Sequence, residues 1–144
     1  CWATAATMLY SWHASQTFEI EEVLLVAGPE YVTKFRSNTG LFGSECNAFI
    51  GPLGMVGEPP MNYSIEGFRS LLEPHGALWV WISVSDQFAH SLVVKGMYGD
   101  GTPEHTYLVY VDPATGTERV STYRAFVDRY EDLSGDDFLQ VIHY

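Results

Sequence analysis

The hydrophobic pattern of the sequence changes at Gly76, and this change constrains the fold more than any other feature. Before Gly76, apolar residues recur at the spacing of helices, three or four residues apart. After it, short apolar runs alternate with turns, a pattern typical of antiparallel strands. Helices followed by antiparallel strands form the α+β fold class, and 144 residues is the length of one domain. We therefore expect a single α+β domain over residues 1–144, with a helical half at 1–76 and an antiparallel β half at 77–144.

Turn and capping residues limit the expected elements. Pro29 suits the first turn of a helix, Ser64 suits a helix N-cap, and Gly99-Asp100-Gly101 is typical of a hairpin turn. Residues 40–60, rich in Gly and Pro, are expected to form a loop that either lines a cleft or is a plain connector. Helices are expected at 2–14, 19–27, 29–37, 65–73 and 122–130, and strands at 77–84, 91–98, 106–111 and 138–143.

Charge and cysteine content argue against several classes of protein. The net charge is −11 and the seven basic residues are scattered, so neither a nucleic-acid partner nor a membrane-surface partner is expected. No apolar run is long enough to span a membrane. Two cysteines are too few for a disulfide scaffold, although a Cys1–Cys46 bridge stays open in an oxidising compartment. Because the cysteines and histidines lack the close paired spacing of zinc ligands, no metal or other cofactor is expected.

Cys1 is the candidate nucleophile. It precedes a run of good helix formers, residues 2–9, that contains no Gly or Pro. A thiol at a helix N-terminus lies in the positive end of the helix dipole, which favours the reactive thiolate. A cysteine in this position, with a histidine elsewhere in the chain, is typical of nucleophilic catalysis.

His90 is the candidate base for such a nucleophile. It begins an apolar strand, where a scaffold holds a side chain firmly while leaving it reachable. An ordinary half-buried strand histidine is the alternative. The other histidines are expected in less suitable places: His13 on the first helix about three turns from the thiol, His75 in a solvated turn, His105 in a solvent-facing loop and His143 on the last strand.

Asp112 is the candidate partner of His90, because it ends the strand after the hairpin turn. On neighbouring antiparallel strands the start of one lies beside the end of the next, so the two side chains are expected to be close. A carboxylate there would hold the histidine tautomer and stabilise the imidazolium. The alternative for Asp112 is turn formation, since Asp-Pro commonly begins a turn.

Several segments, taken together and in this order, resemble papain-like cysteine peptidases. The similarity extends to the compact bacterial branch that includes secreted effector proteases of plant pathogens, and it spans residues 1–130. The segments are Cys1-Trp2-Ala3 at the head of a helix, Leu71-Leu72-Glu73-Pro74-His75-Gly76-Ala77-Leu78-Trp79-Val80, His90-Ser91-Leu92-Val93-Val94-Lys95-Gly96 and Val111-Asp112-Pro113-Ala114-Thr115-Gly116.

The resemblance implies a papain-like fold, with the cysteine on the helical part and the histidine and aspartate on the antiparallel sheet. It implies that Cys1 is the nucleophile, His90 the general acid and base, and Asp112 the orienting residue. The implied activity is cleavage of peptide bonds through a thioester, by a secreted bacterial effector or toxin domain that acts in a target cell. Protein or peptide substrates are then expected, and an immunity or activating protein is a candidate partner.

The resemblance also implies a Gln a few residues before the cysteine, as an oxyanion donor. No residue precedes Cys1 in this sequence, so this Gln either lies upstream or the form is impaired. Other functions stay open with the same three residues: a transglutaminase or deamidase, or a peptidoglycan amidase. Two further alternatives are a hydrolase that uses the α-amino group of Cys1 as its base and an inactive binding module.

Overall fold

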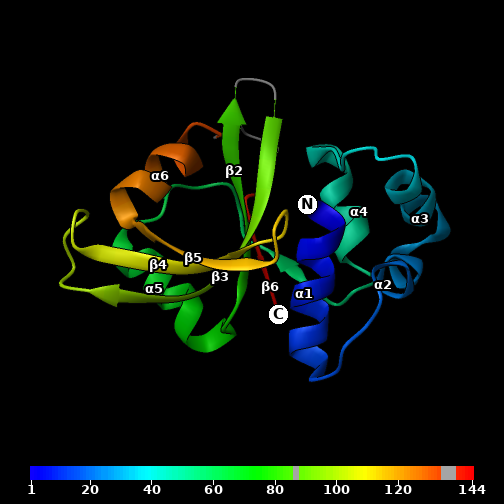
Figure 1. Ribbon diagram of the computed structural model, residues 1–144, viewed down its shortest axis with the longest axis horizontal. Helices are drawn as coiled ribbons and strands as arrows, with labels where there is room; N and C mark the ends of the chain where they lie inside the picture. The colour runs from blue at the N-terminus through cyan, green and yellow to red at the C-terminus, as the bar shows by residue number, and fades with distance from the viewer. Residues whose placement is uncertain (86–87, 134–138) are drawn as a thin grey trace.

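Most helices precede the sheet, as the sequence predicts. The computed structural model describes residues 1–85, 88–133 and 139–144 (Figure 1). Its helical elements are α1 (Trp2–Ala14), α2 (Ile20–Ala27), α3 (Pro29–Arg36), the 3₁₀ turn η1 (Gly43–Glu45), α4 (Cys46–Ile50), α5 (Ile65–His75) and α6 (Tyr123–Glu131). Its strands are β1 (Val56–Gly57), β2 (Leu78–Ser85), β3 (Phe88–Gly99), β4 (Thr106–Asp112), β5 (Thr117–Thr122) and β6 (Val141–His143). In these ranges, no helix is both long and apolar enough to cross a bilayer.

The described strands form one antiparallel sheet in the order β1-β6-β2-β3-β4-β5. Strands β2 to β5 follow one another as a meander, whereas β6 returns from the end of the chain to lie between β1 and β2. Val93 pairs with Val111, so the end of β4 lies beside the part of β3 that directly follows His90. This register brings together the two strand ends that carry the candidate histidine and aspartate.

Both faces of the sheet are covered by helices, and the apolar sequence of β2 explains why. Successive side chains of a strand point to opposite faces. Trp79 and Trp81 pack in the core on the α1–α4 side, whereas Leu78, Val80 and Ile82 pack in the core on the α5–α6 side (Figure 1). A strand that is apolar at every position is therefore buried on both sides. The result is an α+β architecture with the sheet as its middle layer.

Small side chains allow α1 to lie against the sheet. Ala3, Ala5 and Ala6 are buried, and the helix contacts β2 and β3. Trp2 is also buried, and its ring meets Phe49 of α4 edge to face, with 5.3 Å between the centroids. This packing fixes the N-terminal end of α1 beside the sheet.

The structure corrects several expected boundaries. Strand β5 lies outside the predicted strands, because it is an edge strand that is polar at every position except Val120 and has no apolar stripe. Residues 40–60 contain η1, α4 and β1 as well as loop, because Phe49 and Ile50 bury an apolar turn against α1 and the sheet. Helix α5 continues through Pro74 to His75. Strand β6 begins at Val141, and residue 138 of the predicted last strand lies outside the described residues.

Candidate active site

Cys1 is the N-cap residue of α1, and it is exposed. Its carbonyl oxygen accepts a hydrogen bond from the N–H of Ala5 at 2.9 Å, the first bond of the helix. The first turn contains no acidic residue, so no side chain there offsets the positive end of the helix dipole. A thiolate at this position is stabilised, and Cys1 therefore has the surroundings expected of a nucleophile.

The second cysteine lies in the opposite environment. Cys46 is fully buried in the core beneath the helices, and its thiol donates to the carbonyl oxygen of Phe42 at 3.7 Å. Burial raises the pKa of the Cys46 thiol to about 11, and the nearby carboxylate of Glu45 adds to the rise. Both cysteines are free thiols, so the Cys1–Cys46 bridge that the sequence left open is not formed. Of the two, only Cys1 is accessible to a substrate.

His90 and Asp112 are hydrogen-bonded to each other. His90 lies near the start of β3 and Asp112 ends β4, and 2.7 Å separates His90 Nε2 from Asp112 Oδ1. The two side chains are 19% and 20% exposed, so the pair is sheltered yet open to small molecules. The proximity expected from neighbouring strand ends is therefore present.

Asp112 is held in its charged form. Burial raises the pKa of its carboxyl group, but the hydrogen bonds from His90 and from the main-chain N–H of Ala114 outweigh burial, so the pKa lies below its ordinary value. A carboxylate only accepts hydrogen bonds, so His90 Nε2 carries the hydrogen and donates it. The neutral ring then keeps a lone pair on Nδ1, which is available to take a proton.

The end of α1 that carries Cys1 lies close to this pair. Ala89, which precedes His90, packs in the same cluster as Trp2, which follows Cys1. Burial lowers the pKa of the Cys1 α-amino group, and the charge of Asp112 partly reverses this lowering. Within the described part of the chain, no hydrogen bond joins the Cys1 thiol to His90. Catalytic hydrogen bonds are often long without substrate, so geometry of this kind does not exclude the pairing.

A cleft of about 670 Å³ adjoins Cys1. Residues 40–43, the first four of the glycine-rich segment at 40–60, form part of its wall. Phe42 and Phe88 are 64% and 69% exposed, whereas Trp81 is buried. Among the described lining residues none is basic. The remaining lining residues are Trp2, Ser83, Ser85, Ala89, Asp132 and Leu133.

The other histidines lie apart from Cys1. His13, in the last turn of α1, stacks on the ring of Tyr144 with 3.7 Å between centroids, and His105 is exposed as predicted. The prediction of a solvated turn at His75 is wrong, because this residue ends α5 and stacks on His143. With Glu58, these two histidines form a separate cluster that sequence spacing did not reveal.

Comparison with known proteins gives one informative match. The model of the family described as papain-like cysteine protease AvrRpt2 matches residues 1–131, a range that contains Cys1, His90 and Asp112. No curated protein and no solved structure matches the chain.

Proposed function

The chain belongs to the AvrRpt2 family of papain-like cysteine proteases, a family of bacterial effector proteases. We propose that it cleaves peptide bonds with Cys1, His90 and Asp112. The observation that carries the proposal is the 2.7 Å bond between His90 and Asp112, near a helix N-terminus that presents an exposed thiol beside a cleft. A cysteine hydrolase needs these three roles and an opening for its substrate.

In the first half of the reaction, His90 Nδ1 takes the proton of the Cys1 thiol. The thiolate attacks the carbonyl carbon of the scissile peptide bond and forms a tetrahedral oxyanion. Collapse of this intermediate breaks the C–N bond, and the imidazolium of His90 gives its proton to the leaving amine. The product is a thioester on Cys1, and Asp112 stabilises the charge that His90 carries during the step.

In the second half, water replaces the amine. His90 takes a proton from the water molecule as its oxygen attacks the thioester carbonyl carbon. The C–S bond then breaks, the carboxylic acid leaves, and the proton returns to Cys1. The main-chain N–H of Cys1, in a chain where a peptide bond precedes it, is a candidate donor to both oxyanions.

The cleft favours a protein or peptide substrate. Exposed aromatic side chains at Phe42 and Phe88 offer apolar surface to a substrate in the cleft beside Cys1. The proposal includes secretion of the protein and action within a target cell, and the membership of an effector family supports both. An immunity or activating protein stays a prediction from the sequence.

Activity on a protein substrate tests the proposal. The chain should cleave unfolded casein, and Cys1→Ala and His90→Ala should abolish cleavage, whereas Cys46→Ala, a change at the buried thiol, should retain it. The same samples are then offered an amine donor such as dansylcadaverine. Incorporation of the amine into casein glutamine without chain cleavage would replace the protease proposal with a transglutaminase. A folded chain that gives neither product would favour a binding module or an amidase.

A further inference from the structure

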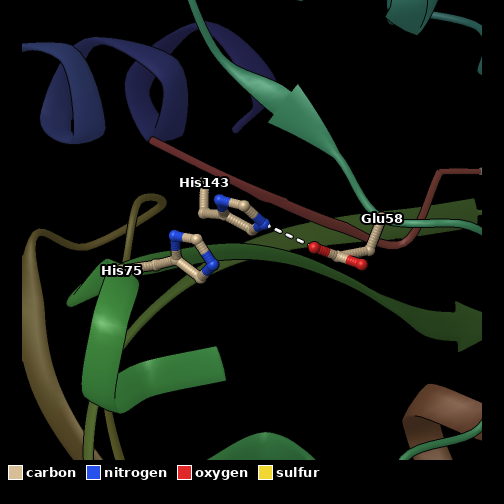
Figure 2. Close-up of side chains that lie close together, drawn as sticks. All are labelled: Glu58, His75 and His143. Atoms are coloured by element: carbon tan, nitrogen blue, oxygen red, sulfur yellow. Dashed lines mark hydrogen bonds and ion pairs between the residues drawn. The ribbon is translucent and has the colours of Figure 1, made fainter. Parts of the chain in front are cut away.

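Glu58, His75 and His143 converge at the end of α1 that is remote from Cys1 (Figure 2). Glu58 follows β1, and its main-chain N–H donates to the carbonyl oxygen of Val141 in β6 at 2.8 Å. His143 lies on β6 and His75 ends α5. Three elements that are distant in sequence therefore contribute one side chain each.

The cluster is tied to the C-terminal end of α1. His13 in the last turn of α1 stacks on Tyr144, and the main-chain oxygen of Tyr144 is bonded to both cluster histidines. At about 1.5 Å per residue, the helix places Cys1 about 20 Å from His13. The cluster is thus separate from the candidate active site, which does not use it.

The hydrogen bond to Tyr144 sets the tautomer of His75, and a second bond to the same oxygen orients His143. Nδ1 of His75 lies 2.7 Å and Nδ1 of His143 lies 3.0 Å from the main-chain oxygen of Tyr144. This oxygen only accepts, so each Nδ1 carries a hydrogen and donates it. The neutral ring of His75 therefore keeps its lone pair on Nε2, whereas Nε2 of His143 is bonded to Glu58. An Nδ1–H bonded to a main-chain oxygen is the usual outer partner of a histidine that binds metal through Nε2.

Nε2 of His143 faces an acceptor. It lies 2.7 Å from Oε1 of Glu58, and the side chains of His143 and Glu58 are only 4% and 25% exposed. Because a carboxylate only accepts, Nε2 of His143 carries a hydrogen and donates it to Glu58, and a metal ion bound here would take the place of that hydrogen. The second nitrogen of His75 lies on the Glu58 side of its ring (Figure 2), and in the described residues it has no hydrogen-bond partner.

From these contacts we propose that Glu58, His75 and His143 bind a Zn²⁺ ion. One ligand atom from each residue lies within 4.8 Å of the other two. Ligands of a tetrahedral zinc are about 3.3 Å apart for bonds of about 2.0–2.1 Å. Binding therefore separates His143 from Glu58, which lie 2.7 Å apart, and brings His75 closer to both. His75 is the group that moves, because it is half-buried at a helix end and must tilt away from its stacked position, 3.7 Å from the His143 ring.

The donor set selects the type of metal. Two imidazoles and one carboxylate, with water in the fourth position, form a common zinc set. Ca²⁺ and Mg²⁺ prefer oxygen ligands alone and are not expected here. Bound zinc joins α5 to β1 and β6 and holds Tyr144 against α1, so it stabilises the fold and leaves the chemistry at Cys1 unchanged.

Zinc titration tests the proposal in the Cys1→Ala chain, which removes the accessible thiolate as a competing ligand. Calorimetric titration with ZnCl₂ should show saturable binding of one ion per chain, and zinc should raise the melting temperature until EDTA is added. His75→Gln and Glu58→Gln, in the same background, should each weaken binding at least tenfold. His105→Gln, which changes an exposed histidine outside the cluster, should bind zinc like the parent.

Absence of saturable binding by the folded parent would overturn the proposal, as would undiminished binding by a folded His75→Gln chain. Gln can still donate to Tyr144, which favours folding of this variant. X-ray absorption of the zinc-loaded parent needs no further substitution. Scattering from two imidazoles supports the site, whereas a sulfur ligand or fewer than two imidazoles refutes it. None of these measurements depends on protease activity.

Discussion

His90 and Ala114 both donate hydrogen bonds to the same atom, Oδ1 of Asp112, at 2.7 and 3.0 Å. The main-chain N–H of Ala114 therefore helps to hold the Oδ1 atom in front of His90. This arrangement leaves Nδ1 as the nitrogen that can accept a proton. The orientation of the histidine thus depends on the turn after β4 as well as on the carboxylate itself.

Two replacements of Asp112 separate the contribution of its carboxylate from that of the Ala114 N–H. Asp112→Ala should lower kcat by about 10²- to 10⁴-fold, because the tautomer and the imidazolium lose their support. Asp112→Asn should lose less, because the Ala114 N–H holds the amide oxygen at the Oδ1 position. Steady-state kinetics on one peptide substrate measures both variants, and an Asn variant as impaired as the Ala variant would contradict the role given to Ala114.

Acid should remove a stabilising contribution of Asp112. Its pKa in the folded chain is lower than the ordinary value of 3.8. The charged carboxylate therefore stabilises the fold at pH values above 3.8, and this contribution disappears as the pH falls through the lower, folded-state pKa. Urea unfolding should show wild type more stable than Asp112→Asn near neutral pH. This difference in the free energy of unfolding should shrink as the pH falls below 3.8. A difference that grows on acidification would contradict the sign of the shift.

The two cysteines should differ in reactivity. Iodoacetamide at mildly acidic pH should label Cys1 quickly, because an imidazolium at His90 and the helix dipole favour its thiolate. Cys46 should stay unlabelled, because burial raises its pKa to about 11. Mass spectrometry of the labelled peptides measures both rates, and unfolding in urea provides the control in which the two become alike. Labelling of Cys1 that is as fast in His90→Ala would refute a thiolate–imidazolium pair.

Much of the candidate site follows from local sequence signals. The turn at residues 99–101 predicted the β3–β4 hairpin, and this hairpin brings His90 to Asp112 as expected. The match to the protease family agrees with the predicted resemblance over nearly the same range. The hairpin was predictable because its pairing is local, but the register shift between Val94 and Gly96 has no signal in the turn residues.

Other features depend on contacts between distant segments and gave no local signal. Strand β5 carries mostly exposed polar residues, so its pairing with β4 at the sheet edge has no hydrophobic pattern to mark it. His75 and His143 meet only because β6 returns between β1 and β2, beside the end of α5. A search for closely spaced ligands in the sequence cannot detect a cluster that three elements assemble.

The exposed aromatic residues of the cleft should contribute to substrate binding. Phe42→Ala should lower kcat/KM on apolar peptides by about fivefold, equivalent to about 1 kcal/mol of lost burial, mostly through KM. The side chain is 64% exposed, so the fold should tolerate the change. Tyr98→Ala is the matched control, because Tyr98 is 55% exposed and lies outside the cleft. Equal losses in the two variants would show that Phe42 has no specific part in binding.

The hairpin that positions His90 should be sensitive to a methyl group at Gly99. This residue has a φ of 140°, and a Cβ atom there would lie 2.2 Å from the main-chain oxygen of His105. Backbone atoms on the opposing strand cannot move aside as a flexible side chain would, so Gly99→Ala should lower the free energy of unfolding by about 1–3 kcal/mol. Gly96 is the control, because a Cβ there meets nothing within 4 Å. Urea unfolding of Gly96→Ala should show no loss or a gain of up to about 1 kcal/mol, and equal stability of the two variants would mean that the hairpin relaxes around the added methyl group.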